Sequence, residues 1–491
     1  MSDRIRAVRR RTLPALLAVA VAVGGSLLAA APASASETVI PVTPSTTPFD
    51  DAYFVMQHNT YDYGSSMTSW LDQGFRAVEI DVIDRGDWEN DANGPYVSHD
   101  GSPYNANCSA TSDDRLGDCL RDIAVWQTAH PGSGPIEVFI DMKASWDPAN
   151  AWNDDEVAGL DQQVHSMLGE RMYTADQLYQ FMTGTTYSGG EGLRNAVATA
   201  GWPSLASIGD RIVIDYTGGK VGLVNQTQGN GIDYEMSHTG HLPYGFFCPD
   251  VEADPDELNP GGTVDGMSAA TSAQVVCSNM DSQDHYEVTA DRAAKYHQLM
   301  HLWGGHVFGN ESYVFNYIAI AHGVTAIGRD STSASDTFGG TLPIEGVRGS
   351  VPGYFELRAS DSGSTCVDAR SSGTSNGTAI QRYGCDSTAA QRFVYTGEGQ
   401  LRPQYDNPLC VDIDGGSAKA GKAIHLWDCD GGSSEKWVIA ADGSFRSYDN
   451  TGYCLTMPSG TGTQLSVQSC NGSASQRFAL NAVPAWTPTS F

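Results

Sequence analysis

Short apolar runs alternate with polar, helix-like stretches over the first 330 residues of the chain. The runs at 53–57, 77–82, 136–142, 211–215 and 324–328 predict buried strands. The stretches 116–129 and 156–168 predict helices between them, and we expect long loops at 171–205 and 250–284. This alternation predicts an α/β fold with a largely parallel sheet, and its length suits a (β/α) TIM-like barrel.

The pattern changes after residue 350 to short strands separated by Gly, Ser and Asp, and this pattern repeats. Cys366-Val367-Asp368 recurs after 44 residues as Cys410-Val411-Asp412, and after another 44 as Cys454-Leu455-Thr456. The repeats also share an ending, which reads Gln391-Arg392-Phe393, Glu435-Lys436-Trp437 and Gln476-Arg477-Phe478. Three such units predict a closed, threefold all-β domain. We therefore expect a barrel at 49–330, a Ser/Thr/Gly-rich linker at 331–350 and an all-β domain at 351–481.

The three repeats resemble the ricin-type β-trefoil lectin family, which implies carbohydrate binding. By this resemblance the first two repeats would hold a sugar through Asp368, Gln381 and Tyr383 and through Asp412, His425 and Trp427. The third repeat has Thr456 in place of the Asp, so we expect it not to bind. All three repeats depart from the family pattern at Ala390, Ser434 and Ser475, and a folded spacer without sugar binding is the alternative.

The beginning of the chain is typical of a secretory signal peptide. Five Arg residues precede an apolar run at 13–31, and Ala33-Ser34-Ala35 supplies a small-residue cleavage site. The alternative is a single membrane anchor, which Gly24, Gly25, Pro32 and the small-residue site disfavour. We expect residues 1–35 to be removed and the mature, secreted protein to be extracellular, with no transmembrane anchor.

Charge and cysteine content narrow the class of protein further. The formal charge is −30, and removal of residues 1–35 makes it more negative, so the surface repels nucleic acid. The ten cysteines contain no Cys-x-x-Cys motif, which favours disulfides over zinc in an exported chain. We predict pairing between neighbours along the chain: Cys108–Cys119, Cys248–Cys277, Cys366–Cys385, Cys410–Cys429 and Cys454–Cys470.

Candidate metal ligands lie on the second predicted strand. Glu79 and Asp81 are two residues apart, so both carboxylates project from one face of the strand. Like charges this close repel unless a cation joins them, and Asn59 and Asp141 offer further oxygen ligands. A solvated strand face is the alternative, but the apolar neighbours of the two acids indicate a buried strand, which favours a divalent metal.

Two histidines follow predicted strands close to these acids. Imidazoles with a pKa near neutrality suit general acid–base catalysis, so His58 and His99 are candidate catalytic residues. We expect the remaining histidines, His301 among them, to be structural. Lys143 shares a strand face with Asp141, and two roles stay open for it: contact with a substrate phosphate or pairing with a carboxylate.

The segments His58-Asn59-Thr60-Tyr61, Glu79-Ile80-Asp81 and Ser98-His99-Asp100, with the strand that carries Asp141, resemble phosphoinositide phospholipase C barrels of the secreted bacterial, calcium-dependent branch. The resemblance implies a Ca²⁺ cofactor, catalytic His58 and His99, and the calcium ligands Asn59, Glu79, Asp81 and Asp141. It further implies cleavage of phosphatidylinositol at a membrane surface to diacylglycerol and a cyclic inositol phosphate.

Two other functions remain open from the sequence. A glycerophosphodiester phosphodiesterase would use similar groups, but that family typically has His-Arg-Gly where this chain has His58-Asn59-Thr60. A secreted lectin with an inactive barrel is the third possibility, and the presence of all six site residues disfavours it.

Overall fold

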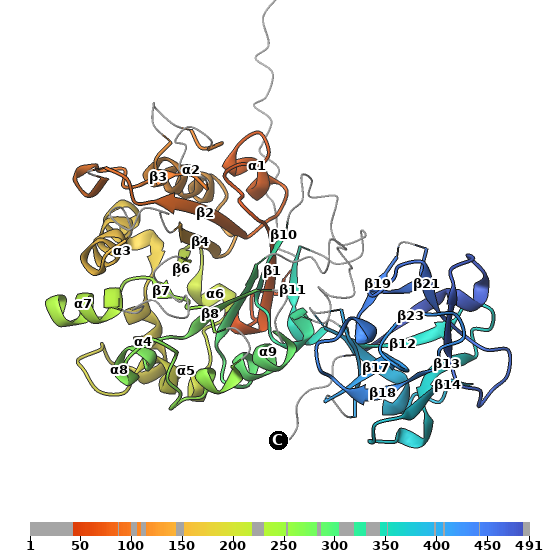
Figure 1. The fold of residues 1–491 in the computed structure, drawn as a ribbon. Helices are drawn as coiled ribbons and strands as arrows, with labels where there is room; N and C mark the ends of the chain where they lie inside the picture. The colour runs from red at the N-terminus through yellow and green to blue at the C-terminus, as the bar shows by residue number, and fades with distance from the viewer. Residues whose placement is uncertain are drawn as a thin grey trace, which may run out of the picture. The chain divides into compact units, whose positions relative to one another are not determined.

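The computed structural model describes residues 43–86, 88–99, 106–109, 114–143, 152–218, 230–251, 254–281, 286–303, 319–329, 344–350, 352–396, 399–405, 408–440 and 442–484. The predicted signal peptide and most of the predicted linker lie outside these residues. Within them, an α/β region is followed by an all-β region, as Figure 1 shows by the change from helices and strands to strands and short turns. The predicted fold class is confirmed.

The α/β region is built on eight parallel strands among the described residues. Two ladders form it, one running β1-β10-β9-β8 and the other β2-β4-β6-β7. The strands are β1 (Ala52–Gln57), β2 (Ala77–Ile83), β4 (Ile136–Lys143), β6 (Ile212–Thr217), β7 (Phe246–Phe247), β8 (Cys277–Asp281), β9 (Leu299–Trp303) and β10 (Ala326–Arg329). All five strands expected from the apolar runs are present within a few residues of the expected positions.

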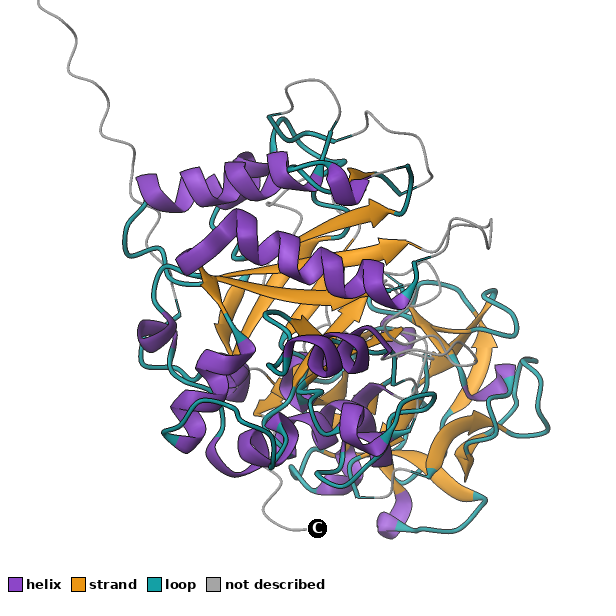
Figure 2. Cartoon of the chain, turned by 90° about the vertical axis from the view of Figure 1, so that its left-hand side faces the viewer, coloured by secondary structure: helices purple, strands orange, loops and turns teal. Residues whose placement is uncertain are grey.

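Helices lie on the outside of these strands (Figure 2). They are α1 (Met67–Asp72), α2 (Leu116–Ala129), α3 (Asp154–Leu168), α4 (Ala175–Thr183), α5 (Leu193–Ala200), α6 (Leu205–Ile208), α7 (Asn230–Thr239), α8 (Ala269–Ser272) and α9 (Tyr286–Lys295). The expectation of long loops at 171–205 and 250–284 is wrong, because α4, α5, α8 and β8 lie there. Several of these elements are too short to show a clear sequence period.

The alternation of side chains along the strands separates two buried layers. Outward residues such as Val78, Ile80, Val138 and Ile140 pack with Leu116, Leu120 and Leu160 of the helices. Inward residues such as Phe54, Ala77, Phe139, Phe246 and Leu299 form a second cluster inside the barrel. Strands buried on both faces explain the continuous apolar runs in the sequence. Glu79, Asp81 and Asp141 interrupt the inward series near the carboxyl ends of their strands.

The two ladders meet at two seams, which are closed differently. At the first seam, Cys248 and Cys277 form a disulfide, and Asp250 and Asn279 form a parallel bridge. At the second seam, between β1 and β2, the edge of β1 is instead taken by the antiparallel strand β11 (Glu345–Val347). Residues 345–347 of the predicted linker therefore belong to the barrel.

Two further short strands extend the second ladder. β3 (Tyr96–Val97) pairs antiparallel with β2, and β5 (Met172–Tyr173) pairs parallel with β6. The pairing of β3 with β2 brings the segment that carries His99 to the carboxyl end of β2.

The all-β region contains three related hairpins, one for each sequence repeat. They are β13 (Thr365–Ala369) with β14 (Thr378–Gly384), β17 (Leu409–Ile413) with β18 (Ile424–Asp428), and β21 (Tyr453–Thr456) with β22 (Ser466–Ser469). The other strands are β12 (Pro352–Ala359), β15 (Arg392–Tyr395), β16 (Leu401–Pro403), β19 (Trp437–Ile439), β20 (Phe445–Ser447) and β23 (Phe478–Pro484). β12 pairs with β23, so the first and last strands of the region are neighbours.

All ten cysteines form disulfides, and the pairs are those predicted between neighbours along the chain. One disulfide closes the base of each hairpin of the all-β region, joining a cysteine of its first strand to a cysteine directly after its second strand. Among the described residues, no helix has the length and apolar character needed to cross a membrane.

Candidate active site

Three carboxylates converge at the carboxyl ends of β2 and β4. In the strand register, Asp81 lies beside Asp141, and Glu79 lies one inward position below Asp81. One oxygen from each residue lies within 4.8 Å of the others, and Glu79 and Asp81 are fully buried. The sequence-based prediction that these acids share one face is therefore met in the structure.

Lys143 lies among these carboxylates. Its Nζ donates a hydrogen bond to Asp141 Oδ2 at 3.0 Å and lies 3.4 Å from Asp81 Oδ2. Burial raises the pKa of Glu79 and of Asp81, and for Asp81 the neighbouring Asp141 raises it further. Burial alone would lower the pKa of Lys143, but the carboxylates around it raise that pKa overall. Lys143 thus pairs with carboxylates, as one of the two roles predicted for it requires.

The turn after β1 holds the acids of β2 in place. Asn59 adopts a left-handed conformation with φ of 53°, which Asn tolerates better than most residues, and its backbone N–H donates to Glu79 Oε2 at 2.7 Å. The Thr60 hydroxyl donates to Gln57 O and accepts from the Glu79 N–H. The Tyr61 hydroxyl donates to Asp81 Oδ2 at 3.0 Å. The His-Asn-Thr-Tyr segment thus joins β1 to β2 by side-chain and backbone hydrogen bonds.

The residues of this cluster suit a hard divalent cation. Asp81 Oδ1 and Asn59 Oδ1 are buried and have no hydrogen-bond partner among the described residues. Buried carboxylate oxygens without donors are costly unless a cation lies near them. Carboxylate and amide oxygens are also the ligands that Ca²⁺ prefers. The four predicted ligands, Asn59, Glu79, Asp81 and Asp141, therefore fit the metal that the sequence implies.

Both candidate histidines lie next to this cluster. His58 follows β1 directly, is partly buried, and has its Nε2 3.9 Å from Glu79 Oε2. His99 is exposed, and the N–H of the preceding Ser98 donates to Asp81 O at 3.0 Å, which holds the segment at the end of β2. The backbone thus brings both imidazoles to the same end of the barrel as the carboxylates.

Two further residues, Gly218 and Tyr61, contribute to the site through contacts that were not predicted from the sequence. Gly218 follows β6 with φ of 74°, and a Cβ atom there would collide with Asp141 Oδ1, so only glycine leaves room for that carboxylate. Tyr61 was part of the recognised segment, but its hydrogen bond to Asp81 depends on the approach of β1 to β2. A glycine a few residues after the predicted strand at 211–215 was the one available signal.

His301, which we predict from the sequence to be structural, lies inside the barrel. Its Nδ1 is 2.8 Å from Asn279 Oδ1, and the Asn279 amide donates to Asp250 Oδ1, so the proton of His301 belongs on Nδ1. Burial lowers the pKa of His301 to about 3, with smaller contributions from His58 and Lys143, so its ring is neutral near pH 7. His301 therefore adds no positive charge to the site.

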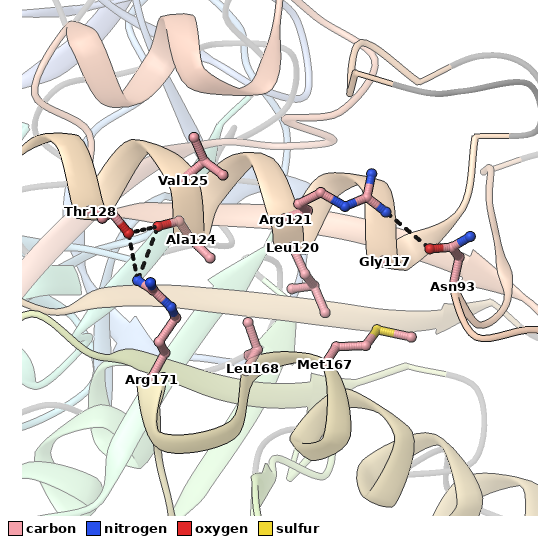
Figure 3. A pocket seen from close by; sticks show the side chains of 10 residues that line it. All are labelled: Asn93, Gly117, Leu120, Arg121, Ala124, Val125, Thr128, Met167, Leu168 and Arg171. Atoms are coloured by element: carbon pink, nitrogen blue, oxygen red, sulfur yellow. Dashed lines mark hydrogen bonds between the residues drawn. The ribbon is translucent and has the colours of Figure 1, made fainter.

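A separate groove lies on the outer layer of the barrel, between α2 and the end of α3 (Figure 3). Leu120, Met167 and Leu168 line its floor. Arg121 donates to Asn93 Oδ1, and Arg171 donates to Ala124 O and Thr128 Oγ1. Because the carboxylate cluster faces the barrel interior, this groove is not part of the candidate active site.

The predicted sugar-binding residues of the first two hairpins come together in each case. In the first, Gln381 Nε2 donates to Asp368 Oδ1 at 2.7 Å, and the Tyr383 side chain is 44% exposed. In the second, His425 Nε2 lies 3.1 Å from Asp412 Oδ2. The second hairpin also stacks His425 on Trp427, which is 43% exposed, with 5.2 Å between ring centroids. An exposed aromatic beside a buried carboxylate is suited to a sugar ring.

The third hairpin differs at each of these positions. Thr456 lies opposite Ser466, and Gln468 lies opposite Cys454, so the acid and the aromatic residue are both missing. This supports the expectation that the third repeat does not bind sugar.

Fold and site together define an α/β barrel with histidines and a cluster of three carboxylates at its strand ends, followed by a β-trefoil. Residues 104–222 match the family model for Ca²⁺-dependent phosphoinositide phospholipase C, and residues 353–479 match that for the ricin-type beta-trefoil lectin domain. The chain thus contains a Ca²⁺-dependent phosphoinositide phospholipase C domain and a ricin-type lectin domain. It is accordingly an enzyme of the phosphoric diester hydrolase class, with Ca²⁺ as its cofactor.

Several solved structures are similar to parts of the chain. A calcium-dependent phosphoinositol-specific phospholipase C from Pseudomonas sp. is 22% identical over 62% of this chain and 97% of its own, with a TM-score of 0.48. A Ca²⁺-dependent phosphatidylinositol-specific enzyme from Streptomyces antibioticus is 21% identical over 58% and 95%, with a TM-score of 0.45. The designed threefold-symmetric protein ThreeFoil is 20% identical over 26% and 99%, with a TM-score of 0.25. No curated protein matches the chain.

Proposed function

We propose that this protein cleaves phosphatidylinositol at a membrane surface to diacylglycerol and a cyclic inositol phosphate, with His58 and His99 as the catalytic residues. The observation that carries the proposal is the convergence of Glu79, Asp81 and Asp141 beside the two histidine segments. Asn59, Glu79, Asp81 and Asp141 would hold the calcium ion. When bound, Ca²⁺ supplies positive charge that favours ionisation of a hydroxyl and offsets charge on the phosphoryl oxygens.

The protein's own residues then move the protons. His58 accepts the proton of the inositol 2-hydroxyl while that oxygen forms a bond to phosphorus. The carboxylate of Glu79, 3.9 Å from His58 Nε2, stabilises the imidazolium that results. The bond between phosphorus and the glycerol oxygen breaks, and His99 donates a proton to that oxygen, which leaves as the diacylglycerol hydroxyl. Attack by a hydroxyl of the substrate itself gives a cyclic phosphodiester as the product.

The exposed position of His99 suits its proposed role. A general acid must regain a proton from solvent after each turnover, and an exposed imidazole does this without a relay. His58 is partly buried beside Glu79, which suits a base that must keep one orientation.

The trefoil would direct the enzyme to glycan-bearing surfaces. Binding through Asp368, Gln381 and Tyr383 and through Asp412, His425 and Trp427 would raise the local concentration of lipid substrate, even with weak affinity at each repeat. We further propose that the protein is secreted, which the five disulfides support.

Phosphorus NMR of the products from phosphatidylinositol vesicles tests the proposed reaction. With Ca²⁺ we expect a cyclic inositol phosphate, and with a chelator no product. We expect His58→Ala and His99→Ala each to lower kcat by at least about 100-fold, because each removes a proton-transfer group. His238→Ala, at an exposed position on α7, is the matched control and should keep full activity.

Thermal unfolding and sugar binding should be the same in the two catalytic variants and the wild type. Hydrolysis of glycerophosphodiesters in place of phosphatidylinositol would contradict the proposed substrate. Full turnover by either Ala variant would contradict the assigned catalytic roles.

A further inference from the structure

The two candidate sugar sites carry opposite charges at equivalent positions. Arg370 lies two residues after Asp368 in the first repeat, and Asp414 lies two residues after Asp412 in the second. Both side chains are exposed. The third repeat has Pro458 at this position and so offers no charge.

Arg370 is tied into the first site by hydrogen bonds. Its Nε donates to Gln381 Oε1 at 2.9 Å, and its Nη2 donates to Gly462 O at 2.9 Å. The bond to Oε1 fixes the Gln381 amide so that its nitrogen donates to Asp368. Among the described residues Nη1 of Arg370 has no hydrogen-bond acceptor. The first site therefore presents a positioned guanidinium group next to Gln381, and Tyr383, whose ring is 44% exposed, follows Gln381 on the same face of β14.

Asp368 itself is fully engaged by neutral donors. Its Oδ1 accepts from Gln381, and its Oδ2 accepts from Gln391 Nε2 at 3.2 Å. The charges of the Asp368 carboxylate and the Arg370 guanidinium therefore cancel within the first site. The charge that faces outward is the positive charge of Arg370.

The second site has the opposite balance. This site contains Asp412 and the exposed Asp414. Glu435, which takes the place of Gln391 in the repeat, is buried and accepts hydrogen bonds from the N–H groups of Asp430 and Gly431 and from Gln400 Nε2. Lys422 offsets part of this charge, because its ammonium lies close to the backbone of Gly415. Other charged residues nearby do not cancel this difference in charge between the two sites. Arg382 of the first repeat is paired with Asp361, and the acid Asp386 of the first repeat is matched by the acid Asp430 of the second.

We propose that the first trefoil repeat binds a sugar that carries a carboxylate, such as a hexuronate, and that the second repeat binds an uncharged sugar and disfavours the acid. A guanidinium pairs with a carboxylate through parallel N–H bonds, which an ammonium cannot reproduce. Carboxylates at the second site repel the same ligand group. This inference rests on the proposed glycan binding and adds the ligand class for each site.

Binding of the full chain to a glycan array that pairs each neutral hexose with its uronate is the test. Asp412→Ala leaves the first site alone, and we expect this variant to prefer galacturonate and glucuronate over galactose and glucose by about five- to tenfold. The preference should weaken as salt is raised from low to physiological concentration, because exposed charges are screened. In the same background Arg370→Gln should remove the preference, so that each uronate binds no more tightly than its neutral hexose.

A charge reversal at the second site gives an independent test. With Asp368→Ala to silence the first site, Asp414→Arg should increase binding of uronates several-fold, and Asp414→Asn should increase it less. Thermal unfolding checks that each variant is folded.

The outcomes separate this inference from the glycan-binding proposal. Neutral-sugar binding that depends on Asp412, with no uronate preference at the first site, would overturn the inference and leave the glycan proposal intact. An unchanged uronate preference in Arg370→Gln would also overturn it. Absence of all sugar binding would overturn both.

Discussion

Lys143 is the residue whose contacts bear most directly on calcium binding. It neutralises part of the charge of Asp81 and Asp141, with its Nζ 3.4 Å and 3.0 Å from their oxygens. An ammonium in this position stabilises the buried acids by itself, but it also repels a divalent cation held by the same oxygens.

We therefore predict opposite effects of Lys143→Met on stability and on metal affinity. Without added metal the variant should lose about 1–3 kcal/mol of unfolding free energy, because two buried carboxylates lose their counter-charge. Calcium should bind more tightly and raise the melting temperature more than in the wild type. Calorimetric titration with Ca²⁺ and thermal unfolding in chelator measure both effects. Arg121→Met, which removes the exposed partner of Asp118, is the control, and weaker calcium binding by Lys143→Met would contradict the prediction.

A second pair of acids is enclosed inside the barrel and has no role in the proposed reaction. Burial raises the pKa of Glu137 and raises that of Asp215 to about 7. In the unfolded chain Asp titrates near pH 4, so the folded protein binds a proton more strongly between about pH 4 and pH 7. This contribution to stability is present at low pH and is lost as the pH rises through the folded pKa.

Asp215→Asn should therefore flatten the dependence of stability on pH. We expect the variant to gain about 2–4 kcal/mol relative to the wild type between pH 4.5 and pH 8, measured by denaturant unfolding at both values. Asp155→Asn, at an exposed position on α3, should not change the slope. A wild-type protein that becomes more stable over this interval would rule out the proposed effect of Asp215.

How far the site was predictable differs from residue to residue. Glu79 and Asp81 were predictable from the sequence because the period of a strand decides which side chains share a face. The hydrogen bond from Tyr61 to Asp81 and the clearance that Gly218 gives Asp141 were not, because each depends on how closely two chain segments approach. The Asp250–Asn279–His301 series was missed for the same reason, since its members come from three separate segments.

At the scale of elements, the strands that were predicted are those with several apolar residues in succession, such as β2 and β4. β7 has only two residues and α8 only four, so neither shows a period. β11 was assigned to a linker because its sequence, Glu-Gly-Val, has no strand-like pattern. It forms a strand only through its pairing with β1, which the sequence does not show. The trefoil was predicted more completely, because the same unit occurs three times and its pattern can be compared between the repeats.

The seam between β7 and β8 is the element contact with the clearest expected effect. Removal of Cys248–Cys277 by a double Ser substitution should cost about 3–4 kcal/mol, because the bond spans 29 residues. The same change at Cys108–Cys119, which spans 11 residues and lies away from the seam, should cost about 3 kcal/mol.

Hydrogen exchange distinguishes the two disulfides more sharply than stability does. Loss of Cys248–Cys277 should accelerate exchange at the amides of β7 and β8, which lose their covalent link. Loss of Cys108–Cys119 should leave those amides unchanged, and equal exchange in the two variants would contradict a role for the disulfide in closing the seam.

At the scale of the whole molecule, the proposed secretion makes a prediction about the mature N-terminus. Expression in a bacterial host with export machinery should yield extracellular protein that begins at Ser36, because cleavage follows Ala33-Ser34-Ala35. Mass spectrometry of the secreted protein reads this position. Ala33→Asp with Ala35→Asp should block processing, and full-length protein retained in the membrane fraction of the wild type would contradict the prediction.

The strand partners of β1 also set the order in which the barrel can be completed. β1 is hydrogen-bonded to β10 and β11, the last strands of the domain, so its neighbours are synthesised long after it. A chain that leaves a ribosome or translocation channel N-terminus first exposes the segment 52–57, whose six side chains are all buried in the native state, until residues 326–347 have followed. An unpaired apolar strand invites association with other chains. Chaperone protection of this segment is therefore needed most while the second half of the barrel is still emerging.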